Sequence, residues 1–475
     1  MKLLIFGIGN FYLNRKGYIE ECNKYDTIVG FVDNRADAIR SFEDKPVYLP
    51  EEISGKEWDT IVIMSVSYVE MREQLLRLGI PNDKIMCWEA YYAYLSGDET
   101  EVFVSKVKKE SGRLRILLIA ISVGYDGSSM AICHVAKELS FRGYDVTLLT
   151  LSCNESIKEN LLQHGVDVKI NKSLKFLERE KYKQFIDYDI AIINTFPNIR
   201  IACELCNYIP TLWWIHENGK KYAGVYDSNR TIFSEYDSPR SFFKARVSAV
   251  SKWAADAFEK YYPNCIDSIL PLGIPDESNY VYGSTVDKPC VFAVIGGIEE
   301  RKAQDIFLEA IESLSVDIRG KARFLIIGAC YKNKYSTAIK DKAIRLPEVI
   351  FTGELDRIAL RKTFGKIDVV VCPSREETLS IAVIEGMMHS KICITTDATG
   401  IADYMLDGVN GFVIPSDDAT KLSEKMRYVI QNINELDNMR QAAREVYDKI
   451  FSMKIFGDRL EMEINKTIQE YKKGC

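Results

Sequence analysis

The stretch that decides the fold runs Val371-Cys-Pro-Ser-Arg-Glu-Glu-Thr-Leu-Ser-Ile-Ala-Val-Ile-Glu-Gly-Met-Met-His389. The run 368–372, which overlaps its start, is short, apolar and β-branched, and this predicts a buried parallel strand. Pro373 ends that strand, and residues 380–389 have the spacing of a helix that packs by one face. The stretch therefore predicts a strand–turn–helix unit of an α/β domain.

Two carboxylates flank the entrance of the predicted helix. Glu377 lies in the turn and Glu385 follows eight residues later, a separation of about 12 Å along a helix. That separation suits the two ends of an elongated ligand. The free amides of a helix N-terminus lie between them and form an anion site, so the unit is suited to a sugar, a diphosphate and a ribose in that order. A pair of solvated surface glutamates is the alternative when this spacing is taken alone.

A second strand–turn–helix unit follows, from Ile392-Cys-Ile-Thr-Thr-Asp-Ala-Thr-Gly400 through Asp407-Gly-Val-Asn-Gly-Phe-Val413 to a helix from Asp418. This order of motifs resembles the donor-binding half of retaining GT-B glycosyltransferases (glycosyltransferase family 4-like, group 1), whose signature is Glu, seven residues, Glu. The resemblance covers residues 113–465. Many relatives carry small glycines where this chain has Thr378-Leu379-Ser380, a departure that bears on how sugar hydroxyls are recognised.

The resemblance implies a role for each residue of the first stretch. Glu377 would hold the sugar hydroxyls and stabilise the transition state, and Glu385 would bind the ribose. The helix entrance would bind the diphosphate, which adds these expected substrate-binding residues: Thr378, Leu379, Ser380 and Ile381.

The strand 291–298 opens the same domain and contains Gly297, and a turn with Arg301 and Lys302 follows it. Two cations at such a turn suit a diphosphate, because charge-assisted contacts neutralise the leaving group; a solvated pair of cations is the alternative. In relatives several residues separate the two cations, which favours Lys302 here. Relatives hold the base at the turn that contains Leu355. A UDP-sugar is the expected donor, although this turn does not distinguish uracil from guanine or adenine.

The preceding domain is expected to face this one. A strand over 115–121 leads into a loop with Gly124, Asp126 and Gly127 at the ligand-binding edge of the sheet, and a plain strand-to-helix turn is the alternative. In the resemblance this loop faces the cleft between the domains. His216 follows the apolar strand 211–215, where it offers a donor and an acceptor to sugar hydroxyls; a buried structural histidine is the alternative. Relatives place a histidine there, near the transferred sugar.

The first residues form a third unit. Lys2-Leu-Leu-Ile-Phe-Gly-Ile-Gly-Asn10 is a strand with a Gly turn, and a second strand ends in Asp33. The third Gly of the dinucleotide fingerprint is missing. The unit is similar to small Rossmann-like modules found beside sugar-modifying enzymes, so we expect a structural or docking module, with NAD binding as the lesser alternative.

Length and composition set the remaining limits. The 475 residues predict two to four domains, which we place at 1–96 (small Rossmann-like accessory domain), 97–112 (linker), 113–283 (acceptor-side domain), 284–452 (nucleotide-sugar-binding domain) and 453–475 (a helix that crosses back). A net charge of −6 argues against nucleic-acid binding. No run is long enough for a membrane span, no signal-peptide pattern begins the chain, and the scattered Cys residues indicate a reducing, cytoplasmic location.

The expected fold class is therefore α/β: the GT-B architecture of two facing Rossmann-like domains, preceded by a small Rossmann-like domain. The expected reaction is retaining transfer of a sugar from a nucleotide-diphosphate donor to a hydroxyl of a glycan, lipid-linked or protein acceptor in surface-glycan assembly. No cofactor and no metal are expected, because Asp187-Tyr-Asp189 precedes its strand and so lies at the wrong edge of the sheet. The alternatives are a nucleotide-sugar epimerase of the same fold and a non-catalytic binding or scaffold protein.

One further segment concerns partners. Residues 169–183 carry six cations interleaved with apolar residues: Lys169, Lys172, Lys175, Arg179, Lys181 and Lys183. The alternatives are a solvated helix face and peripheral contact with an anionic membrane that carries a lipid-linked acceptor. The oligomeric state stays open.

Overall fold

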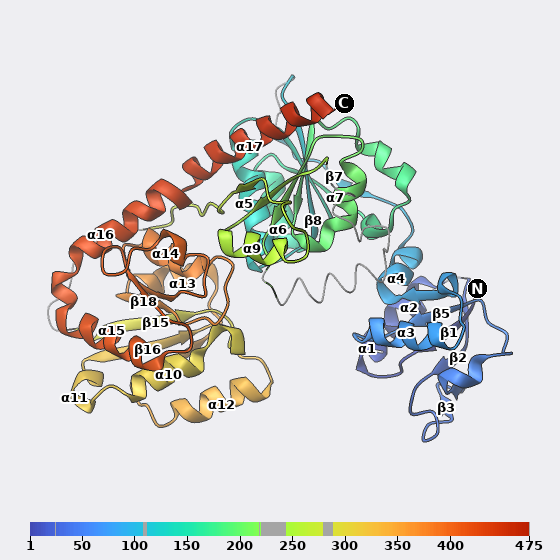
Figure 1. The fold of residues 1–475 in the computed structure, drawn as a ribbon. Helices are drawn as coiled ribbons and strands as arrows, with labels where there is room; N and C mark the ends of the chain where they lie inside the picture. The colour runs from blue at the N-terminus through green and yellow to red at the C-terminus, as the bar shows by residue number, and fades with distance from the viewer. Residues whose placement is uncertain (24, 108–111, 218, 220–243, 279–287, 475) are drawn as a thin grey trace.

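The computed structural model describes residues 1–23, 25–107, 112–217, 219, 244–278 and 288–474. Three α/β domains follow one another, each built on a mainly parallel sheet, and the middle domain lies between the other two (Figure 1). The predicted α/β fold class is confirmed. The predicted boundary at 283/284 lies outside the described residues.

The N-terminal domain has a six-stranded sheet in the order β3-β4-β2-β1-β5-β6. Residues of β1 alternate between two apolar clusters, with Leu3 and Ile5 in one and Leu4 and Phe6 in the other, so both faces of the sheet are covered. The strands are β1 (Lys2–Phe6), β2 (Thr27–Val32), β3 (Ser41–Phe42), β4 (Lys45–Tyr48), β5 (Thr60–Ile63) and β6 (Ile85–Cys87), and the helices are α1 (Asn10–Leu13), α2 (Lys16–Cys22), α3 (Tyr68–Arg77) and α4 (Trp88–Ser96).

The middle domain has an eight-stranded sheet in the order β14-β13-β12-β11-β8-β9-β10-β7. Its central strands are continuous apolar runs because helices cover both faces. The strands are β7 (Glu101–Phe103), β8 (Arg115–Val123), β9 (Asp145–Cys153), β10 (Asp167–Ile170), β11 (Ile190–Asn194), β12 (Thr211–Ile215), β13 (Arg246–Ala249) and β14 (Ser268–Ile269), and the helices are α5 (Gly127–Phe141), α6 (Glu155–Gln163), α7 (Ile199–Leu205) and α9 (Lys252–Glu259).

The segment predicted to be a linker contains a strand of this sheet. β7 pairs antiparallel with β10 at the edge of the sheet. The side chain of Asn171 donates to Thr100 (2.9 Å) and that of Ser173 to the carbonyl of Ala93 (2.8 Å). The N-terminal domain and the segment that follows it are therefore held against the middle domain.

The predicted cationic segment lies at this junction. Lys181 pairs with Asp98, Lys172 lies 6.0 Å from the ring centroid of Tyr18, and Arg179 pairs with Glu204 at 2.9 Å. Three of the six cations of this segment therefore contact neighbouring parts of the chain.

The C-terminal domain has an all-parallel six-stranded sheet in the order β17-β16-β15-β18-β19-β20. The strands are β15 (Cys290–Ile295), β16 (Ala322–Ile327), β17 (Val349–Gly353), β18 (Val369–Cys372), β19 (Ile392–Thr396) and β20 (Phe412–Ile414), and the helices are α10 (Gln304–Glu312), α11 (Val316–Arg319), α12 (Lys334–Ala343), α13 (Arg357–Phe364), α14 (Ile381–Met388), α15 (Ala419–Asn432) and α16 (Asp437–Val446).

The last helix, α17 (Met453–Gly474), leaves this domain and runs along the middle domain (Figure 1). Arg246 of β13 pairs with Glu463 at 2.7 Å, and both side chains are only 10% exposed. The ring of Phe456 stacks on Trp214, with centroids 5.7 Å apart. The helix thus fixes the two larger domains to each other through both ionic and apolar contacts.

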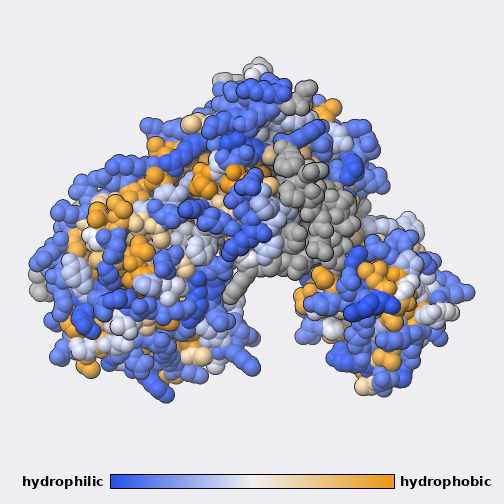
Figure 2. All heavy atoms as spheres, in the orientation of Figure 1, coloured by the Kyte–Doolittle hydropathy of each residue, from blue (hydrophilic) through white to orange (hydrophobic). Residues whose placement is uncertain are grey.

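The face drawn in Figure 2 is mostly hydrophilic over all three domains, with its apolar side chains in several separate groups. Among the described residues, none of the helices combines the length and apolar character that crossing a bilayer requires.

Candidate active site

The loop between β18 and α14 crosses the carboxyl edge of the C-terminal sheet. The backbone amide of Glu377 donates to the carbonyl of Ala398 (3.2 Å), and the amide of Gly400 donates to the carbonyl of Glu377 (2.9 Å). Ser380 caps α14, and its hydroxyl accepts from the amide of Val383 at 3.5 Å. Because the loop after β19 fixes the backbone on both sides of Glu377, the position of its side chain is well defined.

Two cations of one turn hold the Glu377 carboxylate. The short 3₁₀ turn Glu300–Lys302 follows β15, and Arg301 Nη1 lies 2.9 Å from Glu377 Oε2. Lys302 Nζ contacts the same oxygen. The structure therefore brings together three of the predicted site residues, from the loops after two neighbouring strands.

The charge state of Glu377 follows from this contact. Its side chain is 12% exposed. Burial acts to raise the pKa of the carboxyl, but Lys302 and Arg301 outweigh burial and hold that pKa below its usual range. Glu377 is therefore an ionised group in a partly desolvated position.

A second network, of hydrogen bonds around Arg375, holds the turn that carries Arg301 and Lys302. Arg375 donates to Asp305 (2.6 Å), to Asp417 (2.6 Å) and to the carbonyl of Glu300 (2.6 Å), and Tyr335 donates to Asp305 at 2.7 Å. The sequence does not predict this network, because its pairs lie 42 and 70 residues apart and leave no local spacing pattern.

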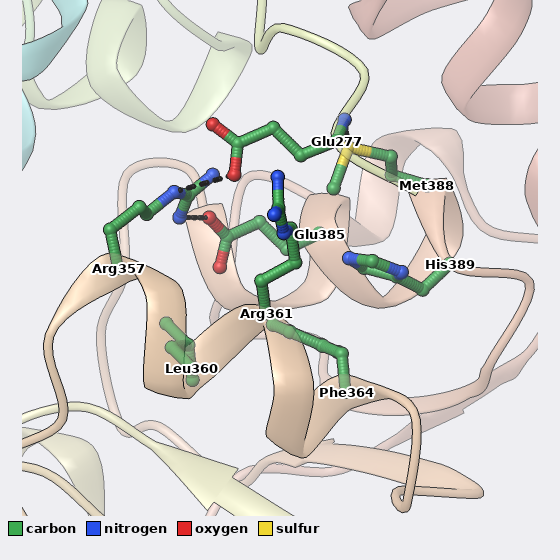
Figure 3. Close-up of a pocket in the computed structure, with 8 residues that line it drawn as sticks. All are labelled: Glu277, Arg357, Leu360, Arg361, Phe364, Glu385, Met388 and His389. Atoms are coloured by element: carbon green, nitrogen blue, oxygen red, sulfur yellow. Dashed lines mark hydrogen bonds and ion pairs between the residues drawn. The ribbon is translucent and has the colours of Figure 1, made fainter. Parts of the chain in front are cut away.

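Glu385 lies further along α14 in a different environment. The residue is 4% exposed and lines a small pocket with seven other residues: Glu277, Arg357, Leu360, Arg361, Phe364, Met388 and His389 (Figure 3). Arg357, the first residue of α13, pairs with it. Burial raises the pKa of Glu385, and Arg357 only partly offsets that effect. His389 stacks on Phe364 with ring centroids 4.6 Å apart, which is a structural role for that histidine.

The predicted helix entrance faces the middle domain. Ser251, which precedes α9, donates through its hydroxyl to the carbonyl of Thr378 (2.6 Å), and Leu379 is buried. A Cβ on Gly127 would lie 3.2 Å from the side chain of Ile381. The N-terminus of α5 thus approaches the N-terminus of α14 across the two domains, and a larger residue than Gly127 would crowd that approach.

Asp126 has a local structural role. Its carboxylate caps α5 by accepting from the amides of Ser128 (3.1 Å) and Ser129 (3.0 Å) and from the hydroxyl of Ser128 (2.8 Å). Burial opposes ionisation, but these hydrogen bonds lower the pKa of Asp126. A Cβ on Gly124 would lie 3.9 Å from this carboxylate.

His216 follows β12 at the carboxyl edge of the middle sheet. Its ring lies edge-on to Trp214, with centroids 4.2 Å apart, and the neighbouring Glu217 accepts from the amides of His216 (3.1 Å) and Phe196 (2.9 Å). Two residues further on, the amide of Gly219 donates to Glu376 at 3.0 Å. The segment after His216 therefore reaches the residue that precedes Glu377.

Gly297 and Leu355 lie in two other loops of the C-terminal domain. A Cβ on Gly297 would lie 2.9 Å from the ring of Tyr331, so only glycine allows that ring to lie against the backbone. Leu355 is partly buried against the core, in the turn that leads into Arg357. Among the described residues, neither Gly297 nor Leu355 hydrogen-bonds to Glu377.

Two other acidic residues that the sequence singles out, Asp189 and Asp33, make structural contacts. Asp189 accepts from the amide of Arg115 (2.6 Å) at the amino ends of β11 and β8, so it lies at the opposite edge of the sheet from His216. In the N-terminal domain, Arg35 donates to both oxygens of Asp33, at 2.9 and 3.1 Å, in the position where a dinucleotide fingerprint would hold a ribose.

The lowered pKa of Glu377 predicts a pH-dependent stability difference between the native protein and Glu377→Gln. An unfolded Glu has a pKa of about 4.3. Because the native pKa is lower, the stabilising contribution of the carboxylate is complete above the unfolded-state pKa. It is lost as the pH falls through the native pKa. Thermal unfolding midpoints, measured from about pH 7 down to about pH 3, should differ most near neutrality and converge in acid. A difference that stays constant over the whole range would contradict this assignment.

Comparison with known proteins identifies two matched regions. Residues 289–432 match the family described as Glycosyl transferases group 1, and residues 1–86 match the family described as C2185-like, N-terminal.

Relatives in sequence carry related descriptions. The chain is 27% identical over 256 residues to the uncharacterized glycosyltransferase MJ1178 of Methanocaldococcus jannaschii, a match that covers 52% of this chain and 67% of that protein. It is 23% identical to the glycogen synthase of Chlamydia muridarum (40% of this chain and 39% of that protein). It is 22% identical to the lipopolysaccharide 1,2-N-acetylglucosaminetransferase of Salmonella typhimurium (42% and 58%). The match spans about two thirds of the first relative and less of the other two.

Solved structures agree on the fold. HepE of Anabaena in complex with UDP-glucose superposes with a TM-score of 0.60 at 15% identity, over 74% of this chain and 100% of that one. The sucrose-phosphate synthase of Thermosynechococcus elongatus gives a TM-score of 0.59 at 14% identity, over 74% and 99%. Residues 289–432 are therefore similar to the Glycosyl transferases group 1 family, and the fold of the chain is of the GT-B type.

Proposed function

We propose that this protein transfers a sugar, with retention of anomeric configuration, from a nucleotide-diphosphate donor to an acceptor hydroxyl. The observation that carries the proposal is the Glu377 carboxylate held between Arg301 and Lys302, beside the N-terminus of α14. Carboxylate, paired cations and helix amides are the groups that a sugar and a diphosphate require side by side.

The donor diphosphate takes the place of Glu377 as the partner of the two cations. Charge-assisted hydrogen bonds of this kind contribute about 1.5–3 kcal/mol each, and the free amides of the first turn of α14 add further donors. Once Lys302 and Arg301 bind phosphate oxygens, the Glu377 carboxylate is released toward the sugar hydroxyls. There its negative charge stabilises an oxocarbenium-like transition state more strongly than the ground state.

The ribose and base extend from the diphosphate along α14. Glu385 binds the ribose hydroxyls, and the turn at Leu355 leads from β17 to α13 beside it. HepE, a neighbour in fold, is described with UDP-glucose bound, which supports a UDP-sugar as donor. We place His216 on the acceptor side, because the segment after it reaches Glu376 through the amide of Gly219, and the leaving phosphate takes the acceptor proton.

The acceptor is a hydroxyl of a glycan, a lipid-linked glycan or a protein in surface-glycan assembly, and the protein works in the cytoplasm or peripherally on the inner face of the membrane. The support is the name of one relative, a lipopolysaccharide transferase. The face of the middle domain near α5 is the side from which this acceptor enters, since the Gly127 loop and His216 lie at that edge.

A panel of nucleotide sugars tests the proposal. With UDP-, GDP- and ADP-sugars, the protein should slowly hydrolyse one donor in the absence of acceptor, and Glu377→Gln should reduce that rate by at least about a hundredfold because the charge near the anomeric carbon is lost. The measurement is release of the nucleoside diphosphate. Glu309→Gln, an exposed carboxylate paired with Lys342 on an outer helix, is the matched control and should retain the wild-type rate.

No hydrolysis of any donor, or isomerisation of a donor without release of nucleotide, would contradict transfer. The second outcome would instead indicate an epimerase of the same fold.

We further propose that the reaction needs no added divalent metal. Arg301, Lys302 and the amides of α14 neutralise the diphosphate, which elsewhere is the task of a bound cation. Donor hydrolysis should therefore persist in excess EDTA. Complete loss of the activity, restored by magnesium or manganese, would show that the leaving group is stabilised in another way.

A further inference from the structure

Two carboxylates share one guanidinium in the pocket at the far end of α14. Figure 3 shows Arg357 between Glu277 and Glu385, with an interaction to each. Arg357 Nε lies 3.0 Å from Glu277 Oε2, and Arg357 Nη1 donates to Glu385 Oε1. The three residues come from different places: the segment after β14, the start of α13 and the body of α14.

The ionised form of Glu385 depends on its contact with Arg357. Its carboxyl is buried, so in isolation the neutral form would be favoured. Arg357 partly offsets that tendency through one oxygen, Oε1, and no hydrogen bond from the described residues reaches the other oxygen. The carboxylate is thus oriented at one oxygen and available at the other.

Arg357 is in turn held by Glu277. The Arg357 side chain is 47% exposed, so water competes for its guanidinium unless a second carboxylate fixes it. Glu277 supplies that carboxylate, and its own side chain is 30% exposed. Without Glu277, the Arg357 guanidinium could move away from Glu385 and be hydrated by solvent.

The segment that carries Glu277 is firmly placed. Arg444 of α16 donates to Asp276 (2.5 Å) and to the carbonyl of Met388 at the end of α14 (2.6 Å). The amide of Glu277 faces the sulfur of Met388 at 3.4 Å. The chain leaving the middle domain is therefore clamped to the helix that carries Glu385.

We propose that Arg357 and Glu277 are positioning residues for the donor: they hold the Glu385 carboxylate in place for the ribose and link the donor site to the segment that crosses between the domains. This inference rests on the proposed function, because it takes Glu385 as the ribose ligand. Glu277 itself acts only through Arg357 and Glu385.

A double-mutant cycle tests the inference with UDP, GDP and ADP as probes in isothermal titrations. Glu277→Gln should weaken the nucleotide that binds the wild-type protein by about fivefold or more, and in a Glu385→Gln background it should have no further effect, because residues that act as a unit are non-additive. Glu277→Asp, which keeps the carboxylate, should restore part of the affinity. Glu309→Gln is again the control and should bind as the wild type does.

The outcomes distinguish the positioning role of Glu277 and Arg357 from the proposed function. Equal weakening by Glu277→Gln in both backgrounds, or no weakening at all, overturns the positioning role and leaves the proposed function intact. If none of the three nucleotides binds the wild-type protein, both claims fall. If Glu385→Gln does not fold, Arg357→Gln replaces it in the cycle, and Glu277→Gln must then add nothing in that background.

Discussion

The contact of Glu377 with Arg301 and Lys302 places a carboxylate and two cations in a partly desolvated site of the C-terminal domain. Charges interact more strongly there than in water, so the groups around them must be held in fixed positions. The Arg375 network holds the cationic turn, and the loop after β19 holds the backbone of Glu377. A transition state that meets such preorganised charges needs little reorganisation.

The helix α14 connects the site around Glu377 to the middle domain and to α16. At its N-terminus the carbonyl of Thr378 accepts from Ser251 of the middle domain, and at its C-terminus Arg444 binds the carbonyl of Met388 while also holding Asp276. The middle domain, the segment that carries Asp276 and the helix α16 therefore all contact α14 or its ends.

Features of the fold that leave a local sequence pattern are predictable. Apolar runs predicted the central strands, and the strand–turn–helix from Val371 to His389 lies where the spacing placed it. Contacts between partners that are distant in the chain are not. Arg357 and Arg375 reach Glu385 and Asp305 across 28 and 70 residues, and no periodicity marks such pairs. The short strand β7 lies in a charged segment whose composition predicts a linker, and only its pairing with β10 reveals the strand. The basic run 169–183 was ambiguous, since a charge pattern does not name its partner; the structure shows Lys181 on Asp98.

A crystal structure of the protein with a nucleoside diphosphate, UDP first, is the most direct test of the proposed exchange of partners at Glu377. The diphosphate oxygens should lie within about 3 Å of Lys302 Nζ and the Arg301 guanidinium, with the Glu377 carboxylate released from both cations and the ribose on Glu385. A nucleotide bound elsewhere, or bound here while Glu377 still pairs with both cations, would contradict the exchange of partners on which the proposed mechanism depends.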